Sequence, residues 1–403
     1  MITSKKILFL GGAKHQASIL SLAKKKRYYV ILCDGDVNCS GKKYADKFYN
    51  ISISNKYKIL EIATEQKISA IISYASEVGA ITQCFVANKL KLPTNKIKSI
   101  ETLVYKNKFR NFLNKNNFYV PKFKVFTEFN DLKLYLRNNK NPHIIKPIDS
   151  SGSKGIFKVN GMNLLKLKKF FIASKKFSIK KKVICEEFIS TYSPQIAGDA
   201  VILNQKIIFS HWGDQYYNSS LNELLPVAES WPTIHTKKNI LYIERELNKL
   251  FKKLKISIGV FNFDMRLTNN GKLMIIEIAP RNGGDYIAEL VKDSTGVDMI
   301  QQTLNLYLGI KISKKELIKS KNINCASLRF GASKKGYLKK INFSEKLKKL
   351  IYKKYLSKNT NDFVKKFLLG KDSLGNIFLK FKNFNQMMSI MKDFNKHINI
   401  IVK

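Results

Sequence analysis

The sequence is poor in cysteine, and no two cysteines have the spacing of a metal site or of a disulfide framework. The five cysteines are odd in number and form no CxxC pair: Cys33, Cys39, Cys84, Cys185 and Cys325. This pattern excludes a zinc-finger type of site and indicates a reducing compartment, so we expect a cytoplasmic protein. No apolar run reaches the roughly 18 residues that a membrane helix needs, and Ile7–Leu10 is too short for a signal peptide. We therefore expect no membrane partner.

Acidic residues are scarce as well. The chain has 29 Asp and Glu against 73 Lys and Arg, a formal net charge of +44. Such an excess is typical of proteins that bind nucleic acids or anionic membranes. However, only seven of the basic residues are arginine, and the lysines are scattered through every segment without the aromatic residues that base recognition requires. We expect no nucleic-acid partner, and some electrostatic attraction of small anionic substrates.

The most informative stretch runs from Asp264 to Asp285 and reads DMRLTNNGKLMIIEIAPRNGGD. Apolar runs at 258–267 and 273–279 predict two strands, and Asn270-Gly271 between them predicts a two-residue type I′ turn. Counting outward from this turn gives three cross-strand pairs: Asn262 with Ala279, Asp264 with Glu277, and Arg266 with Ile275.

This hairpin places two carboxylates side by side. Directly opposed side chains have Cβ atoms roughly 5 Å apart, so Asp264 and Glu277 would repel each other unless a divalent cation lay between them. Arg281 follows on the same face, two pleats beyond Glu277. The hairpin therefore predicts a metal and anion site. The alternative is a solvated hairpin whose charges point into water.

A second polar element precedes the hairpin. Residues 143–159, HIIKPIDSSGSKGIFKV, are expected to form a strand, a loop at 150–155 and a second strand. Small loop residues let backbone N–H groups approach an anion, and Lys146 adds a point charge for phosphate. This is not a Walker loop, because the GxxxxGK[ST] spacing is absent and the loop leads into a strand. The alternative is an ordinary hairpin turn.

The remaining segments predict alternating strands and helices. Four short apolar strands are expected near the amino terminus, at 6–10, 29–33, 48–51 and 70–73. With helical stretches between them, they are typical of βα units and a parallel sheet. Further along, we expect helices at 97–116, 289–308 and from 384, and strands at 326–330 and 377–381. Residues 212–231 are expected to be a loop that either lines an acceptor pocket or packs on the surface.

Taken in order along the chain, these segments resemble the ATP-grasp superfamily. The resemblance rests on Lys108, Lys146 with the loop 150–155, the run VICEEFI at 183–189, Asp264, and the run EIAPR at 277–281. Within the superfamily, the chain is most similar to the group of biotin carboxylase, the carboxylating and formylating purine-synthesis enzymes, and carbamoyl-phosphate-synthetase-like carboxylate ligases.

The resemblance covers nearly the whole chain and implies an α/β fold in three parts. Residues 1–104 would form a half-Rossmann domain that precedes the grasp domain and opens with ILFLGG at 7–12. Residues 105–312 would form the α+β ATP-grasp domain, with a flexible lobe at about 118–187. Residues 313–403 would form a small α+β domain.

The family pattern also implies a role for each matched residue. Lys108 would reach the nucleotide phosphates, and Lys146 would contact the α/β-phosphates and adenine N7. The mobile flap over the triphosphate corresponds to Ser150, Ser151, Gly152, Ser153, Lys154 and Gly155. The hinge whose backbone reads the adenine edge corresponds to Glu186, Glu187, Phe188 and Ile189.

Asp264 and Glu277 resemble the pair that holds Mg²⁺, with Mn²⁺ as an alternative, against the β/γ-phosphates. Arg281 resembles the arginine that steadies the anionic substrate or intermediate. The catalytic residues implied in this way are Arg281, Glu277 and Lys146.

One residue departs from the family pattern. The last strand of the family commonly reads Glu-x-Asn-Pro-Arg, with the asparagine as a further metal ligand, and this chain has Ala279 in its place. Alanine has no ligand atom. Asn262, the expected cross-strand partner of Ala279, is one substitute, and Asn282 or water are others, since Mg²⁺ commonly retains several waters.

The resemblance implies an ADP-forming enzyme that uses ATP and Mg²⁺. It would join a small carboxylate to an amine or other nucleophile through an acyl phosphate, and it would be a homodimer by analogy with its relatives. Two alternatives stay open. One is a carboxylase-type enzyme that activates bicarbonate, and the other is a catalytically weak ATP-binding regulatory protein, which Ala279 would favour.

Overall fold

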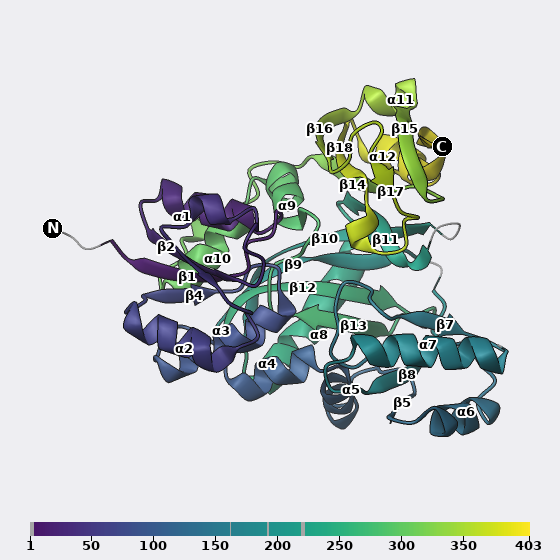
Figure 1. Cartoon of the computed structure of the whole chain (residues 1–403), viewed down its shortest axis with the longest axis horizontal. Helices are drawn as coiled ribbons and strands as arrows, with labels where there is room; N and C mark the ends of the chain where they lie inside the picture. Colours follow the sequence, from purple (N-terminus) through teal and green to yellow (C-terminus); the bar gives the residue numbers. More distant parts are fainter. Residues whose placement is uncertain (1–3, 162, 192, 219–221) are drawn as a thin grey trace.

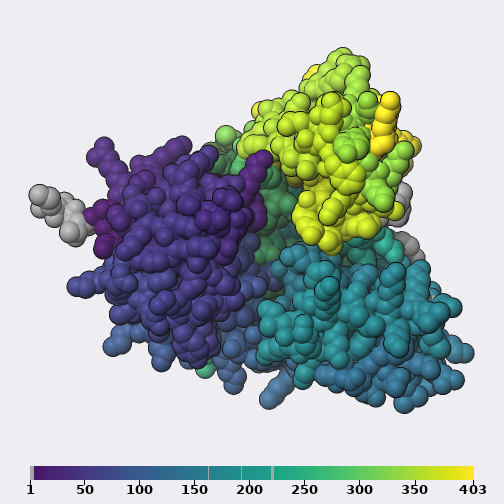
Figure 2. All heavy atoms as spheres, in the orientation of Figure 1, coloured from purple at the N-terminus to yellow at the C-terminus, as the bar shows by residue number. Residues whose placement is uncertain are grey.

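The computed structural model describes residues 4–161, 163–191, 193–218 and 222–403. Figure 1 shows an amino-terminal domain (purple), a small lobe and a large central sheet (blue to green), and a carboxy-terminal part (yellow). In the space-filling view the purple, teal and yellow parts meet around the centre of the molecule (Figure 2). Over the described residues, no helix combines the length and the apolar composition that crossing a bilayer would take.

The amino-terminal domain is a parallel sheet of strand order β3-β2-β1-β4 with helices on both faces. Its elements are β1 (Lys6–Leu10), α1 (Ala17–Lys25), β2 (Tyr29–Asp34), β3 (Lys47–Asn50), α2 (Lys56–Glu65), β4 (Ala70–Ile72), α3 (Glu77–Lys89) and α4 (Ile97–Val104). In β1, Ile7 and Phe9 belong to one buried cluster, and Leu8 and Leu10 belong to another. Both faces are covered, as in parallel sheets generally, and the predicted βα units are confirmed.

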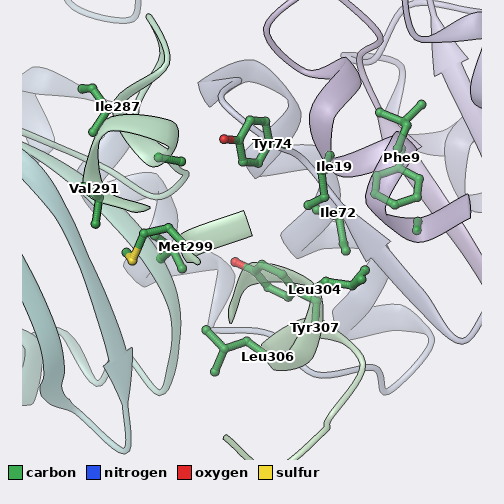
Figure 3. Close-up of a cluster of buried hydrophobic side chains, with 14 of the residues drawn as sticks. Phe9, Ile19, Ile72, Tyr74, Ile287, Val291, Met299, Leu304, Leu306 and Tyr307 are labelled. Atoms are coloured by element: carbon green, nitrogen blue, oxygen red, sulfur yellow. The ribbon is translucent and has the colours of Figure 1, made fainter. Parts of the chain in front are cut away.

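Two helices from later in the chain share a buried cluster with this domain, and the second of them packs against α1 and β4. They are α9 (Ile287–Thr295) and α10 (Met299–Tyr307). Figure 3 shows Leu304 and Tyr307 packed near Ile72 and Ile19, which joins the amino-terminal domain to the rest of the molecule. The prediction of one helix at 289–308 is wrong, because Gly296 adopts a left-handed conformation that ends α9 and Asp298 caps the start of α10.

The large sheet is antiparallel, and its strand order is β13-β12-β9-β10-β11-β14-β18-β16. These strands are β9 (Gln195–Leu203), β10 (Lys206–Asn218), β11 (Asn222–Trp231), β12 (Ile258–Leu267), β13 (Leu273–Ala279), β14 (Asn324–Phe330), β16 (Ile351–Leu356) and β18 (Gly375–Phe381). On one face, Ile196 and Phe263 pack against the apolar stripe of helix α8 (Lys237–Leu254). Alternation along the strands therefore leaves polar residues such as Gln195 and Asp264 on the opposite face.

The prediction of a loop at 212–231 is wrong. Most of this segment forms β10 and β11, which pair with each other, while 219–221 lie outside the described residues. The aromatic residues are part of the core: Trp231 is fully buried, and the ring of Trp212 lies 5.1 Å from that of Phe263. An aromatic and polar mixture here reflects the two faces of a strand pair rather than a loop.

The small lobe has a four-stranded antiparallel sheet of order β5-β8-β6-β7. Its elements are β5 (Phe123–Phe126), α6 (Phe129–Arg137), β6 (His143–Pro147), β7 (Phe157–Val159), α7 (Leu164–Phe177) and β8 (Val183–Glu187). Its own buried cluster includes Phe126, Leu132, Ile145 and Phe171. These elements span 123–187, and the assignment of 118–187 as the flexible lobe of a grasp domain stays a prediction.

The carboxy-terminal part continues the large sheet, since β14 pairs with β11 and carries β18 and β16 beyond it. A second, three-stranded sheet of order β17-β15-β19 packs beside it. Its other elements are β15 (Gly336–Phe343), α11 (Glu345–Lys348), β17 (Phe363–Val364), α12 (Phe384–Met391) and β19 (Ile398–Val402). Short 3-10 helices lie at Lys42–Tyr44, Lys314–Leu317, Gly370–Asp372 and Phe394–His397.

A glycine permits the close approach of β9 and β10. Gly198 has φ +151°, and a Cβ atom on it would lie 2.3 Å from the carbonyl oxygen of His211. We expect Gly198→Ala to lower the free energy of unfolding by about 3 kcal/mol or more, because it combines backbone strain with a steric clash. In Gly35→Ala the new Cβ would have only Ser52 Cα nearby, at 3.9 Å, so urea denaturation should show a change below about 1 kcal/mol. Equal stability of the two variants would contradict this assignment.

Candidate active site

A cavity of about 910 Å³ opens between the large sheet, the small lobe and the amino-terminal domain. Its walls contain most of the residues expected from the sequence: Lys146, Ser150, Ser151, Gly152, Ser153, Lys154, Glu186, Glu187, Phe188, Ile189, Asn262, Asp264, Glu277 and Arg281. The structure therefore brings together segments that lie far apart in the chain. Lys108 and Gly155 are not part of the walls.

The hairpin of β12 and β13 forms as expected at its open end. The confirmed pairs are Asp264 with Glu277 and Asn262 with Ala279. The turn is not the predicted two-residue turn, because Leu267 pairs with Leu273 and the loop between them is longer. Gly271, with φ +70°, closes this loop by donating its N–H to the carbonyl of Thr268.

The longer loop displaces the register near the turn by one residue. Arg266 consequently faces Met274, and the predicted pair of Arg266 with Ile275 is wrong. A β-bulge at Ile276 restores the register before Asp264 is reached. The two irregularities cancel, which is why the carboxylate pair is confirmed although the turn is wrong.

Lys106 occupies the position that was expected of Lys108. Its Nζ lies 3.1 Å from the Glu277 carboxylate and donates to the carbonyl of Ser150 at 2.8 Å. Lys108 instead points outward, 42% exposed, and pairs with Glu101 at 2.6 Å. The predicted helix at 97–116 is broken at Tyr105, so that a new helix, α5 (Lys106–Lys115), begins at Lys106.

A buried ion cluster joins the small lobe to the large sheet. Arg110 on α5 donates through Nε to Glu186 on β8 at 2.9 Å, and Lys146 on β6 lies 2.7 Å from the same carboxylate. Burial alone would raise the pKa of Glu186, but Arg110 and Lys146 outweigh it and hold the pKa at about 2. Burial lowers the pKa of Lys146, which Glu186 only partly offsets.

Arg110 also donates hydrogen bonds to the backbone at the bulge in the hairpin. Its Nη1 donates to the carbonyl of Ile275 at 3.2 Å and its Nη2 to that of Ile276 at 2.8 Å. The bulge leaves backbone groups without ladder partners, and Arg110 supplies them with donors. Arg110 is 1% exposed, so these contacts are shielded from water.

The carboxylate pair fits a magnesium ion that arrives with phosphates. Burial, and next the Glu277 charge, raise the pKa of Asp264 to about 7. Within the described ranges, no three His, Cys, Asp or Glu side chains gather into a set that could hold a metal alone. Mg²⁺ in nucleotide sites is commonly held by one or two carboxylates together with substrate phosphates, and Asp264 with Glu277 matches that donor set.

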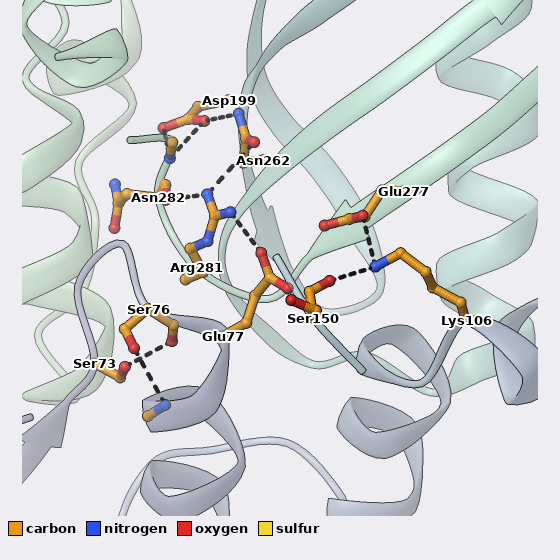
Figure 4. Close-up of polar contacts among 12 residues, drawn as sticks. Ser73, Ser76, Glu77, Lys106, Ser150, Asp199, Asn262, Glu277, Arg281 and Asn282 are labelled. Atoms are coloured by element: carbon orange, nitrogen blue, oxygen red, sulfur yellow. Dashed lines mark hydrogen bonds and ion pairs between the residues drawn. The ribbon is translucent and has the colours of Figure 1, made fainter. Parts of the chain in front are cut away.

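Asn262, which was expected as a substitute metal ligand, contacts Asp199 and Arg281 in this structure. Its Nδ2 donates to Asp199 at 2.9 Å, and its Oδ1 lies 3.5 Å from Nη1 of Arg281 (Figure 4). Both polar ends of this amide are therefore engaged on the arginine side of the hairpin. Asp199 is fixed in turn by the N–H of Gly283, at 3.0 Å from each carboxylate oxygen.

Arg281 is held in place by a contact from the amino-terminal domain. Its Nη2 lies 2.6 Å from the carboxylate of Glu77, the first residue of α3, and its Nη1 donates to the carbonyl of Asn282 at 2.8 Å (Figure 4). Its Nε is buried and has no partner among the described residues. The arginine is thus fixed in orientation and retains one donor.

The loop at 150–155 lies against the opposite wall. Its residues 150–154 line the cavity, while Gly155 anchors the loop in the small lobe, where a Cβ atom would lie within 3.2 Å of Phe177 and Ser174. Gly152 and Gly155 have positive φ values, as the expected anion-binding loop would use them.

The backbone at the end of β8 lines the cavity at Glu187, Phe188 and Ile189. The N–H groups of Glu187 and Phe188 donate to the carbonyls of Lys122 and Pro142. In the described part of the chain, the N–H of Ile189 has no backbone acceptor. Phe188 and Ile189 therefore supply an apolar surface and one backbone donor, which suits a purine ring.

Several site residues were missed in the sequence. They are Lys106, Arg110 and Asp199, together with the cavity residues Gln195 and Arg329. Gln215 and Glu229 also line the cavity, and they lie in the segment 212–231, for which an acceptor pocket was one of the two alternatives. A signal existed for the first two: the buried positions of α5 are Lys106, Phe109, Arg110 and Leu113, which follow one helical face.

Comparisons with known proteins agree with this geometry. Residues 105–285 match the family model of the ATP-grasp domain. The chain is 26% identical over 310 residues to a formate-dependent phosphoribosylglycinamide formyltransferase of Prochlorococcus marinus (strain NATL1A), covering 76% of this chain and 78% of that protein.

Two solved structures are similar over nearly the whole length. Phosphoribosylglycinamide synthetase from Anaerococcus prevotii has a TM-score of 0.74 at 21% identity, covering 99% of this chain and 100% of that one. L-amino acid ligase from Bacillus licheniformis has a TM-score of 0.79 at 17% identity, covering 99% of both chains. These likenesses show that the chain shares the fold of those two proteins.

Removing the arginine of the ion cluster should destabilise the protein strongly. We expect Arg110→Met to lower the free energy of unfolding by about 3–5 kcal/mol, because it leaves the buried Glu186 carboxylate and two carbonyls short of donors. Arg245→Met, on an exposed side chain of α8, should change it by less than about 0.5 kcal/mol. Urea denaturation measures both. If Arg110→Met behaved like Arg245→Met, the cluster would have no structural role.

Proposed function

We propose that this chain is an ADP-forming ligase of the ATP-grasp type, which joins a carboxylate to an amine through an acyl phosphate. One observation carries the proposal: two buried lysines, a facing pair of carboxylates and a fixed arginine converge on one cavity. They are Lys106, Lys146, Asp264, Glu277 and Arg281.

In this proposal the nucleotide spans the small lobe and the large sheet. The adenine ring lies against Phe188 and Ile189, with the free N–H of Ile189 as donor. The triphosphate extends toward Lys146 and Lys106, whose positive charges offset the repulsion between phosphates and an incoming carboxylate. The loop at 150–154 closes over it.

Asp264 and Glu277 would hold Mg²⁺ against the phosphates. Bound there, the ion neutralises charge that develops on the transferred phosphoryl group. Glu277 would exchange its present partner, Lys106, for the ion. Ala279 contributes no ligand atom, so the remaining coordination positions would be filled by phosphates and water.

Arg281 orients the carboxylate that attacks the γ-phosphorus. Glu77 and the Asn282 carbonyl fix its guanidinium, and its buried Nε has no partner among the described residues. The acyl phosphate formed in this way reacts readily with water. Closure of the loop at 150–154 excludes water until the amine displaces phosphate.

A matched pair of lysine variants tests the nucleotide site. We expect Lys106→Met to weaken MgADP binding at least tenfold, because it removes a charge from the cavity wall, and Lys108→Met to change it less than twofold. Isothermal titration calorimetry measures both affinities. The reverse order of effects would restore the role first expected of Lys108.

Turnover tests the reaction itself. We expect ADP release from MgATP to need a carboxylate together with an amine, and a first panel combines formate, acetate and amino acids with ammonium and primary amines. Formate comes first because the named activity of the Prochlorococcus relative depends on it. Glu277→Gln should lower ADP release about 100-fold or more, while the control Glu101→Gln, which lies outside the cavity walls, should leave it unchanged.

Each other outcome has a defined meaning. Stimulation by bicarbonate alone would favour the carboxylase-type alternative. MgADP binding without turnover on any member of the panel would favour a regulatory protein, for which Ala279 is the supporting observation. Undiminished turnover in Glu277→Gln would refute the assignment of this carboxylate.

A further inference from the structure

A row of polar side chains crosses the large sheet on the face that lines the cavity. Gln195 on β9 is the cross-strand partner of Gln215 on β10, which is in turn the partner of Glu229 on β11. Arg266 on β12 extends the row at one end through a hydrogen bond to Gln195. Directly opposed residues on neighbouring strands point to the same side, so the row is continuous across four strands.

The hydrogen bonds of this row run in one direction. The arginine can only donate, and its Nε donates to Oε1 of Gln195 at 3.3 Å. The amide nitrogen of Gln195 must then face Gln215, donating to Oε1 at 2.7 Å, and that of Gln215 faces Glu229, donating to Oε1 at 2.9 Å. A positive end at Arg266 thus fixes both amides and delivers one hydrogen bond to Glu229.

Glu229 ends the row with an unused oxygen. The residue is 8% exposed, and its Oε2 has no hydrogen-bond partner among the residues that the structure covers. A buried polar atom without a partner is costly, and an ionised carboxylate oxygen can only accept. Because Glu229 lines the cavity, a donor on a bound molecule can supply the missing partner.

The charges around Glu229 favour a cation. Burial, and next the charge of Asp285, raise the pKa of Glu229 to about 8, and Asp264 acts in the same direction. Arg329 opposes them, but its guanidinium already pairs with Asp285 at 2.7 Å and donates to the carbonyl of Pro226 at 2.7 Å. Of the charged side chains that act on Glu229, two are acidic, Asp285 and Asp264, and one is basic, Arg329.

We propose that the cavity wall at Glu229 is the subsite for a cationic amino group of the acceptor substrate. The inference rests on the proposed function, which supplies the acceptor. Three strand spacings, roughly 14 Å, separate β11 from β12, which carries Asp264. Glu229 therefore binds a recognition group of the acceptor away from the phosphates, and the acceptor has a second polar end that reaches the acyl phosphate.

The probe is n-propylammonium, with n-propanol as its neutral isostere and propionate as the anion. Ligand-observed NMR titration of the protein with saturating MgADP measures each affinity. We expect n-propylammonium to bind at least tenfold more tightly than the other two. Glu229→Gln should remove this preference, whereas Glu223→Gln should change it less than twofold, since Glu223 lines the same cavity but is 52% exposed and already pairs with Lys158.

Equal binding of cation and alcohol, preference for propionate, or an unchanged preference in Glu229→Gln would each overturn the proposal. The affinity for MgADP, measured by calorimetry on the same samples, tests the proposed function separately. A protein that does not bind MgADP would contradict the proposed nucleotide site. The affinity for n-propylammonium would still test the role of Glu229.

A measurement on the wild-type protein covers the case in which Glu229→Gln does not fold. An alkylammonium stays protonated below about pH 10, as lysine does. Because the pKa of Glu229 is about 8, the cation must displace a proton at lower pH, so its affinity should rise as pH increases from 6 to 8. The binding of n-propanol should stay flat over this range. An affinity for the cation that falls with pH would indicate that the protonated carboxyl donates to the ligand, which overturns the proposal.

Discussion

The rest of the site depends on one buried guanidinium. Arg110 contacts Glu186 in the small lobe and the carbonyls of Ile275 and Ile276 in the large sheet, so one side chain sets the relative position of two sheets. A buried charge tolerates little displacement, because each lost partner leaves a polar group without water or protein to replace it. The floor of the cavity between the lobes is consequently fixed, while the loop at 150–154 lines another wall of the cavity.

Local patterns in the sequence predicted the strands and the βα units, because these depend on interactions between residues close in the chain. The alternation of apolar and polar residues gave the strands at 258–267 and 273–279 with correct ends, and the βα units of the amino-terminal domain were confirmed. The turn between the two strands was wrong, and so was the pair of Arg266 with Ile275. Bulges arise from contacts across the fold, here the donors of Arg110, and a hairpin considered alone contains no sign of them.

The choice between neighbouring lysines depends on a helix face. Lys106 and Lys108 are equivalent in composition, but only Lys106 shares the buried stripe of Phe109 and Leu113. The helical spacing of the apolar residues in this segment would have identified Lys106 as the buried lysine. The row that ends at Glu229 is different, because its members come from four strands whose order along the sheet is not the order along the chain. No local pattern predicts such a row, and only the assembled sheet reveals it.

The ion pair between Lys106 and Glu277 has a consequence for ligand binding, because a ligand must replace the partner of each charge that it engages. Each of the two charges now neutralises the other, with Lys106 buried and Glu277 24% exposed. A metal ion alone would capture Glu277 and leave a buried ammonium without a counter-ion, and a free triphosphate alone would capture Lys106 and leave a carboxylate facing phosphate. Only a complex that carries both signs replaces both partners at once. Under the proposed function, the pair would therefore bind the metal-nucleotide complex in preference to the metal ion or the nucleotide alone.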